Sequence, residues 1–134
     1  MNSKGETMHK SLLLMSVVLG SVVWLSTAKA GTGIVGNTQI QRVLSTDGKW
    51  GGCAVRLAEP VQSSITSVTS GGSVSCPGNL LSLDCVGNQI AKSAAQNLFS
   101  SAQLSYVTGS TVDLYIDDSV LFNGYCRAYR IDNK

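Results

Sequence analysis

The sequence contains few charged residues, few aromatic residues and a single histidine. Asp, Glu, Lys and Arg make up 13% of the 134 residues, the formal net charge is +2, and His9 is the only histidine. Nucleic-acid binding needs a clustered positive field, and so small a charge does not indicate one, so we expect no nucleic-acid partner. Catalytic sites that use histidine as a general base have only His9 to draw on.

The first thirty residues have the order typical of a secretory signal peptide. A basic start is followed by sixteen apolar or small residues without a charge at 11–26, and residues 28–30 form an A-x-A cleavage pattern. The apolar stretch is too short for a comfortable membrane span, which needs about 20 residues. We therefore predict that residues 1–30 are removed by cleavage after Ala30. The protein should then be exported, to the periplasm or out of the cell, with no membrane span after cleavage.

The predicted mature chain, residues 31–134, is long enough for a single domain with a modest core. It carries seven basic and seven acidic residues and no histidine, which excludes histidine-dependent nucleophilic catalysis. All four cysteines of the sequence lie in it: Cys53, Cys76, Cys85 and Cys126. An even number of cysteines in a small exported chain predicts two disulfides. Because neither a C-x-x-C pair nor a histidine accompanies them, we expect no metal site and no cofactor.

Alternating and β-branched residues predict five strands in the mature chain. These strands are expected at residues 38–44, 49–57, 80–85, 111–118 and 125–131. Asp47-Gly48 is a turn signal between the first two strands, and Gly51-Gly52 indicates a bulge or bend inside the second. Eleven of the eighteen residues at 62–79 are Ser, Thr or Gly, so this segment is predicted to be an exposed loop.

One amphipathic helix is expected between the third and fourth strands, within residues 91–109. Its core-facing stripe recurs at spacings of three and four and consists of Ala91, Ala95, Leu98, Phe99, Ala102 and Tyr106. Ser93 is the candidate N-cap, and Gly109 suits the left-handed residue after the last turn. The resulting order, β-β-β-α-β-β, predicts a mainly β, OB-fold-like five-stranded barrel. A five-stranded open sheet with the helix on one face is the alternative.

Several segments are similar to a known toxin group. They are "GCAVRL", "LSLDC" and the helix-to-strand stretch "SSAQLSYVTGSTVDLYIDDS", and the similarity extends over about residues 53–116. They resemble the OB-fold B subunits of the subtilase-cytotoxin and pertussis-like AB5 toxin group. The resemblance covers about half the chain and implies the fold, oligomeric assembly and glycan binding, but no sugar-binding residue is carried over. The closing stretch "NGYCRAYRID" looks like small exported bacterial proteins without an assigned function.

Two disulfide pairings fit the expected strand order. We favour Cys53–Cys85, which would join the second and third strands, together with Cys76–Cys126, which would tie the loop to the last strand. Adjacent strands bring Cα atoms within the ~4.4–6.8 Å that a disulfide requires. The rival pairing, Cys76–Cys85 with Cys53–Cys126, stays open.

The acidic residues do not indicate catalysis. Asp117-Asp118 is the only adjacent carboxylate pair in the sequence. Neighbouring residues in a strand point to opposite faces, so these two carboxylates would not converge as general acid and base. We expect them to be solvated groups near the end of a strand, and we expect no enzyme.

The last strand supplies the best candidate for binding. Alternation places Cys126 and Ala128 inside and gives a row of Tyr125, Arg127 and Tyr129 outside, in which tyrosine rings flank a guanidinium. Arg130 should then lie at the rim of the inner side. Ile131 breaks the pattern, because it falls on the outer face.

Two further aromatic residues complete the candidate binding set, namely Tyr115 and Trp50. The predicted function is an exported, non-catalytic binding module of the toxin B-subunit type, whose partner is a glycan. The alternative is an accessory or inhibitor protein that binds another exported protein. A homo-oligomer is compatible with both.

Overall fold

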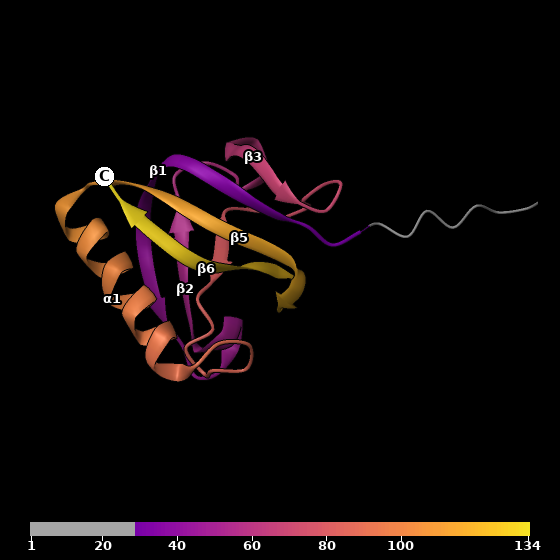
Figure 1. Cartoon of the computed structure of the whole chain (residues 1–134). Coiled ribbons are helices and arrows are strands. Elements are labelled where there is room, and N and C mark those ends of the chain that lie inside the picture. Colours follow the sequence, from indigo (N-terminus) through magenta and orange to yellow (C-terminus); the bar gives the residue numbers. More distant parts are fainter. Residues whose placement is uncertain (1–28) are drawn as a thin grey trace, which may run out of the picture.

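The computed structural model describes residues 29–134, which form a mainly β structure with one α-helix (Figure 1). The strands are β1 (Thr32–Ser45), β2 (Cys53–Leu57), β3 (Ile65–Ser70), β4 (Leu80–Ser82), β5 (Thr111–Phe122) and β6 (Tyr125–Asn133). Helix α1 (Lys92–Thr108) lies between β4 and β5, and short 3-10 segments η1 (Lys49–Gly52) and η2 (Gln62–Ser64) flank β2. The predicted signal peptide falls almost wholly outside the described residues. Within 29–134, no helix combines the length and the apolar character that crossing a membrane requires.

All six strands belong to one sheet, in the order β2-β4-β6-β5-β1-β3, and β1 pairs with β2 as well. The β4–β6 pair is parallel and the other pairs are antiparallel. Strand β1 pairs with three other strands because it is long and its register is interrupted. Its residues 32–39 pair with β5, residues 32–35 also pair with β3, and residues 40–45 pair with β2. A break in the β1–β5 register coincides with Asn37, which has a φ of 51°.

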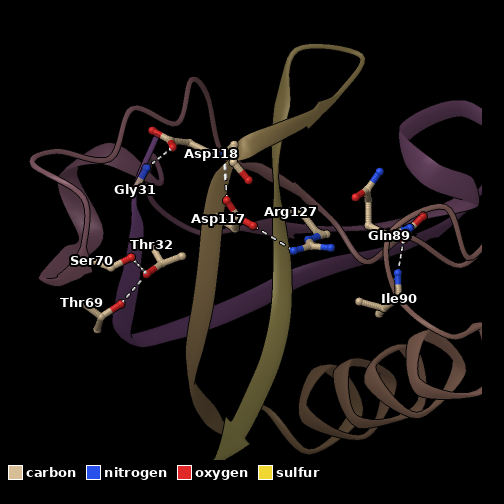
Figure 2. A network of polar contacts seen from close by, with 11 residues as sticks. Gly31, Thr32, Thr69, Ser70, Gln89, Ile90, Asp117, Asp118 and Arg127 are labelled. Atoms are coloured by element: carbon tan, nitrogen blue, oxygen red, sulfur yellow. Dashed lines mark hydrogen bonds and ion pairs between the residues drawn. The ribbon is translucent and has the colours of Figure 1, made fainter. Parts of the chain in front are cut away.

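The segment 62–79 is not a loop throughout, as its composition had predicted. Residues Ile65–Ser70 form β3, which pairs with β1 at one end of the sheet. The hydroxyl of Thr32 in β1 lies 2.8 Å from that of Thr69 and 2.7 Å from that of Ser70 (Figure 2). The Ser- and Gly-rich composition of the segment predicts a loop, but four of the six residues of β3 are β-branched. Such residues favour an extended backbone once a partner strand is present.

The second strand begins later than its sequence suggests. Residues Lys49–Gly52 form η1, and Trp50, Gly51 and Gly52 have φ values of 50°, 71° and 84°. The bend predicted at the two glycines is therefore present. A methyl group on Gly51 would come within 2.6 Å of the Ser82 hydroxyl, so glycine is needed there for space as well as for its positive φ.

The helix ends as predicted but begins differently. Gly109 adopts the left-handed conformation at φ 68° and its N–H donates to the Ser105 carbonyl. The N-cap is Ala91 rather than Ser93, and no side chain caps that end.

The face of α1 that meets the sheet is a seam of small residues, namely Ala95, Ala102 and Ser105. Two residues of the predicted stripe, Ala91 and Tyr106, are exposed instead. Ser105 takes the place of Tyr106 because its hydroxyl donates to Asn133 of β6 at 2.8 Å. Small side chains let the helix approach the sheet closely, where a tyrosine ring would not fit.

The core lies between the inner face of the sheet and α1. Its aliphatic residues are Val35, Ile40, Val55, Leu57, Val61, Val74, Leu81, Leu83, Val112, Leu114 and Ile116. Disulfides Cys53–Cys85 and Cys76–Cys126 border it, each with its Cα atoms 5.5 Å apart. These are the pairs favoured from the sequence, so the rival pairing is wrong. The second bridge ties the segment after β3 to β6, which places both ends of a long covalent loop against the core.

A candidate binding face on β5 and β6

The first half of β6 has the two faces expected from alternation. Cys126 and Ala128 are fully buried, whereas Tyr125, Arg127 and Tyr129 are partly exposed. The side chains of β5 alternate likewise. Val112, Leu114 and Ile116 are fully buried, so Tyr115 lies on the outer face.

A bulge in β6 changes the alternation after Tyr129. Ile116 pairs with Ala128, but Tyr115 pairs with Arg130, so Tyr129 has no opposite residue in β5. Beyond the bulge, Ile131 pairs with Leu114 and packs against the core. The predictions that Arg130 lies on the inner side and Ile131 on the outer face are therefore both wrong. Because of the extra residue, each later side chain of β6 points to the face opposite to the one that strict alternation predicts.

The bulge brings two tyrosines and an arginine together, and we name Tyr115, Tyr129 and Arg130 the aromatic patch. The two rings have centroids 6.2 Å apart at an interplanar angle of 58°, and the guanidinium carbon of Arg130 lies 4.5 Å from the Tyr115 centroid. Such a contact is a cation–π interaction. Strands β5 and β6 therefore present two tyrosine rings and the positive charge of Arg130 next to one another.

Asp132 holds the guanidinium in place. It accepts two hydrogen bonds from Arg130, from Nε at 2.8 Å and from a terminal nitrogen at 2.7 Å. These bonds, and then the charge of Asp132, raise the pKa of Arg130 above its ordinary value. The Arg130 side chain is still 58% exposed, so part of its donor surface faces solvent.

Asp113, two residues before Tyr115 in β5, is bonded to β1 and to the end of the chain. It accepts the N–H of Asn37 at 2.8 Å and lies 2.9 Å from the ammonium of Lys134. The Asn37 bond is the main cause, and Lys134 a further one, of an Asp113 pKa below the ordinary value. The carboxylate is therefore charged at neutral pH.

An open pocket of about 440 Å³ adjoins Asp113, and we name it the polar pocket. Its lining comes from residues 36–39 of β1, from Ala58 and Glu59 after β2, and from Ser63, Ser64, Thr66 and Thr111. Hydroxyl and amide side chains and the carboxylate of Glu59 therefore lie in this pocket together with apolar surface. Gly36 keeps it open, because a methyl group there would come within 2.9 Å of Thr66, and that same position is 3.5 Å from Asp113 Oδ1.

Two predicted binding residues lie apart from the aromatic patch. Tyr125 lies at the turn end of the β5–β6 hairpin, where its ring is 3.2 Å from the position that a methyl group on Gly78 would take. Trp50 lies in η1, and its backbone N–H donates to the side-chain oxygen of Asn123, in the hairpin turn, at 3.3 Å. The structure therefore brings Tyr115 and Tyr129 together and leaves Trp50 and Tyr125 at the hairpin turn.

Arg127 is engaged in an ion pair and does not join the aromatic patch. It donates to Asp117 at 2.8 Å, and the two side chains are only 13% and 12% exposed (Figure 2). Burial alone would raise the pKa of Asp117, but hydrogen bonds from Ser119 and the charge of Arg127 outweigh it and hold that pKa below the ordinary value. The predicted row of Tyr125, Arg127 and Tyr129 is thus divided, and Arg130 supplies the exposed cation.

The adjacent carboxylates do not converge, as predicted, but they are not simply solvated. Asp118 faces β1, where it accepts the N–H of Gly31 at 2.6 Å, and it also accepts the N–H of Ser75 at 2.8 Å. Asp117 faces Arg127 instead (Figure 2). Backbone amides bind Asp118 and a guanidinium binds Asp117, in place of the water expected around the two carboxylates. Each carboxylate therefore joins separate segments of the chain.

Asp84 is a structurally important residue that the sequence patterns missed. It is fully buried at φ 55°, and its carboxylate accepts backbone N–H groups from Asn88 at 3.0 Å, Gln89 at 2.6 Å and Ile90 at 3.1 Å. Figure 2 shows two of these donors, Gln89 and Ile90. The signal in the sequence is an aspartate that precedes a Gly- and Asn-containing turn, two residues after the end of β4, where its side chain can accept the N–H groups of the following backbone.

No protein-family model matches this chain, and neither a curated protein nor a solved structure matches it. Function is therefore inferred from the geometry of the outer face.

Proposed function

We propose that the protein is an exported, non-catalytic binding module with an OB-fold-like barrel, and that its outer face of β5 and β6 binds a glycan. The observation that carries the proposal is the aromatic patch, in which the Arg130 guanidinium lies over the Tyr115 ring and Tyr129 lies beside that ring. Tyrosine rings offer flat surfaces to the C–H faces of a sugar, while their hydroxyls and the Arg130–Asp132 pair offer donors and acceptors to its hydroxyl groups.

The strand pairings support the barrel. Because β1 pairs with both β2 and β5, five strands follow one another in a ring, namely β1, β2, β4, β6 and β5. Along the chain these five strands follow in the order β1, β2, β4, β5 and β6. Helix α1 lies between the third and the fourth of them, β4 and β5, which is the OB-fold order. On this proposal β3 is an addition outside the five-stranded ring.

Two other features support export and a toxin-like class. Two disulfides are typical of proteins that fold in an oxidising compartment. The resemblance of residues 53–116 to AB5 toxin B subunits suggests a glycan as the partner and a homo-oligomer as the assembly.

A glycan array probed with the exported, purified protein tests the proposal, and calorimetry with the best-bound glycan measures its strength. Tyr115→Ala should weaken binding at least tenfold, which is about 1.4 kcal/mol. Tyr106→Ala is the matched control, because Tyr106 is 49% exposed on α1 and lies outside the aromatic patch; it should leave affinity unchanged. An array without specific binding, or equal losses in both variants, would contradict the proposal.

The second candidate function is that of an accessory or inhibitor protein that binds another exported protein. The observation that favours it is β3, which pairs with β1 on one side and is not paired to another described strand on its other side. A free strand edge accepts an extended partner segment. Val68 of β3 is 47% exposed.

This candidate predicts that co-purification from the native compartment yields one stoichiometric partner. Val68→Lys should abolish that complex, because charged side chains block pairing at an edge. Val107→Lys, at a residue of α1 that is 79% exposed, should leave it intact. Loss of the complex in neither variant would exclude β3 as the contact.

A further inference from the structure

The start of β1 is joined to β5 through Asp118. The N–H of Gly31 donates to Asp118 Oδ1 at 2.6 Å (Figure 2), and the N–H of Asp118 donates to the Gly31 carbonyl at 3.2 Å. The second carboxylate oxygen accepts the N–H of Ser75 at 2.8 Å, one residue before the disulfide-bonded Cys76. One carboxylate therefore connects the first residue of the predicted mature chain with the segment that carries the second disulfide.

The surroundings of Gly31 suit a positive charge. Gly31 is buried, and a methyl group on it would collide with the carbonyl oxygens of Ser70 and Ser73, so both oxygens crowd this residue. Residues 70–75, which supply its neighbours Ser70, Gly71 and Ser73, are all uncharged. Its nitrogen thus faces a carboxylate, and its Cα lies among carbonyl oxygens.

We propose that Asp118 is the binding site for the α-ammonium group created when the chain is cleaved after Ala30. The step is hydrolysis, catalysed by the signal peptidase of the exporting cell. Water adds across the bond between Ala30 and Gly31, Ala30 leaves as a carboxylate, and Gly31 keeps the nitrogen as a protonated amine. The proposal rests on the export proposed above and is independent of glycan binding.

Cleavage changes the chemistry of this contact without moving it. In the precursor, Gly31 offers Asp118 one neutral amide N–H. In the mature chain it offers a full positive charge at the same place, so Coulomb attraction between two full charges is added to a hydrogen bond whose acceptor was already charged. Maturation would therefore strengthen the link between β1, β5 and the segment before Cys76, and the mature protein should be more stable than a form that retains Ala30.

The ion pair has a defined pH dependence. An α-amino group ordinarily has a pKa of about 7.7–8.0, and pairing with Asp118 should raise it in the folded state. The stabilisation is then complete below about pH 7.7 and is lost as the pH rises through the higher folded value. The other charged groups nearby are Asp117 and Arg127, which pair with each other, and Lys29, which cleavage removes.

The test uses the full chain expressed in an exporting bacterium and purified after export. Mass spectrometry should find Gly31 as the first residue. Titration of the Gly31 Cα protons by NMR should give an amine pKa raised by about one unit, which corresponds to about a tenfold change in the unfolding equilibrium. Asp118→Asn should return that pKa to about 8 or below, whereas Asp47→Asn, at an exposed position in the β1–β2 connection, should not change it.

Each result decides something separate. A first residue other than Gly31 would overturn the cleavage, and an unshifted amine in the wild-type protein would overturn the ion pair even with the correct terminus. A merely structural role for Asp118 would lower stability in Asp118→Asn without an elevated amine pKa in the wild type. Glycan binding by the same preparation is measured separately, so its failure would not bear on this outcome.

Discussion

Replacing Asp84 with asparagine should destabilise the protein although the side chain keeps its size and shape. Asp84 is fully buried, and its φ of 55° is one that asparagine adopts more readily than most residues. The substitution therefore leaves the backbone conformation acceptable and changes only the hydrogen bonding of the side chain. It isolates the contribution of the carboxylate to the turn that leads from β4 towards α1.

The expected loss follows from the three bonds. One carboxylate oxygen accepts the N–H of Asn88, and the other accepts those of Gln89 and Ile90. In the variant one oxygen becomes an NH₂ group, so at least one backbone N–H loses its acceptor. A hydrogen bond to a charged group contributes roughly 1.5–3 kcal/mol, so Asp84→Asn should cost about 1.5–3 kcal/mol of the free energy of unfolding for each backbone N–H that loses its acceptor. That is a large share of the ~5–15 kcal/mol typical of a domain.

Urea unfolding measures this loss. Trp50 is the only tryptophan in residues 31–134, and its carbonyl accepts the Ser82 hydroxyl at 2.8 Å, so its fluorescence reports on this region. Circular dichroism should give the same midpoint. Asp47→Asn, at an exposed aspartate, should change stability by less than about 0.5 kcal/mol. An Asp84→Asn loss as small as that of the control would refute the role given to the three hydrogen bonds.

Three further predictions concern the core and β5. Replacing Cys76 and Cys126 together with serine opens a loop of sequence separation 50, and the chain-entropy relation gives a loss of ~4 kcal/mol, measured by thermal unfolding; a loss under about 1 kcal/mol would contradict it. Because folding lowers the pKa of Asp117, this carboxylate stabilises the folded protein above about pH 3.9, and the stabilisation is lost as the pH falls through the folded pKa. Arg127→Gln should make the free energy of unfolding less sensitive to acid, and an unchanged pH dependence of stability would argue against the Asp117–Arg127 ion pair. Ala102→Leu should cost about 1–3 kcal/mol by overpacking the α1 seam, whereas an unchanged melting temperature would mean that the seam has room.

Much of the fold could be predicted because the patterns that specify it are local. The alternation of Val112, Leu114 and Ile116 placed one face of β5 in the core, and Gly109 marked the helix end. The disulfide pairing favoured from strand adjacency is the one present. These features depend on residues within one element or on neighbouring elements.

Other features depend on contacts between distant segments and were missed. Strand β3 has a loop-like composition and is ordered by pairing with β1. Ser105 is buried instead of Tyr106 because Asn133, from the last strand, lies opposite it. Neither partner is visible from the residues of the segment itself, so composition and periodicity gave the wrong answer for both.

For the candidate site, the sequence predicted that Arg127 lies with the tyrosines, whereas the structure places Arg130 beside Tyr115 and Tyr129. Strict alternation grouped Arg127 with Tyr129, and the bulge in β6 replaces it with Arg130, which lies over Tyr115. The position of Ile131, an aliphatic residue on a nominally outer face, was the one local sign of the bulge. A break in alternation within a strand is thus evidence for an extra residue in the pairing.

Chemical-shift mapping by NMR, with the glycan that binds best on the array, tests the central claim most directly. Binding on the proposed face predicts that the largest changes occur in backbone amides of β5 and β6 around Tyr115, Tyr129 and Arg130, with smaller changes at residues 36–39 of the polar pocket. Changes centred on Trp50 and Tyr125 at the hairpin turn, or on the exposed face of α1, would contradict it.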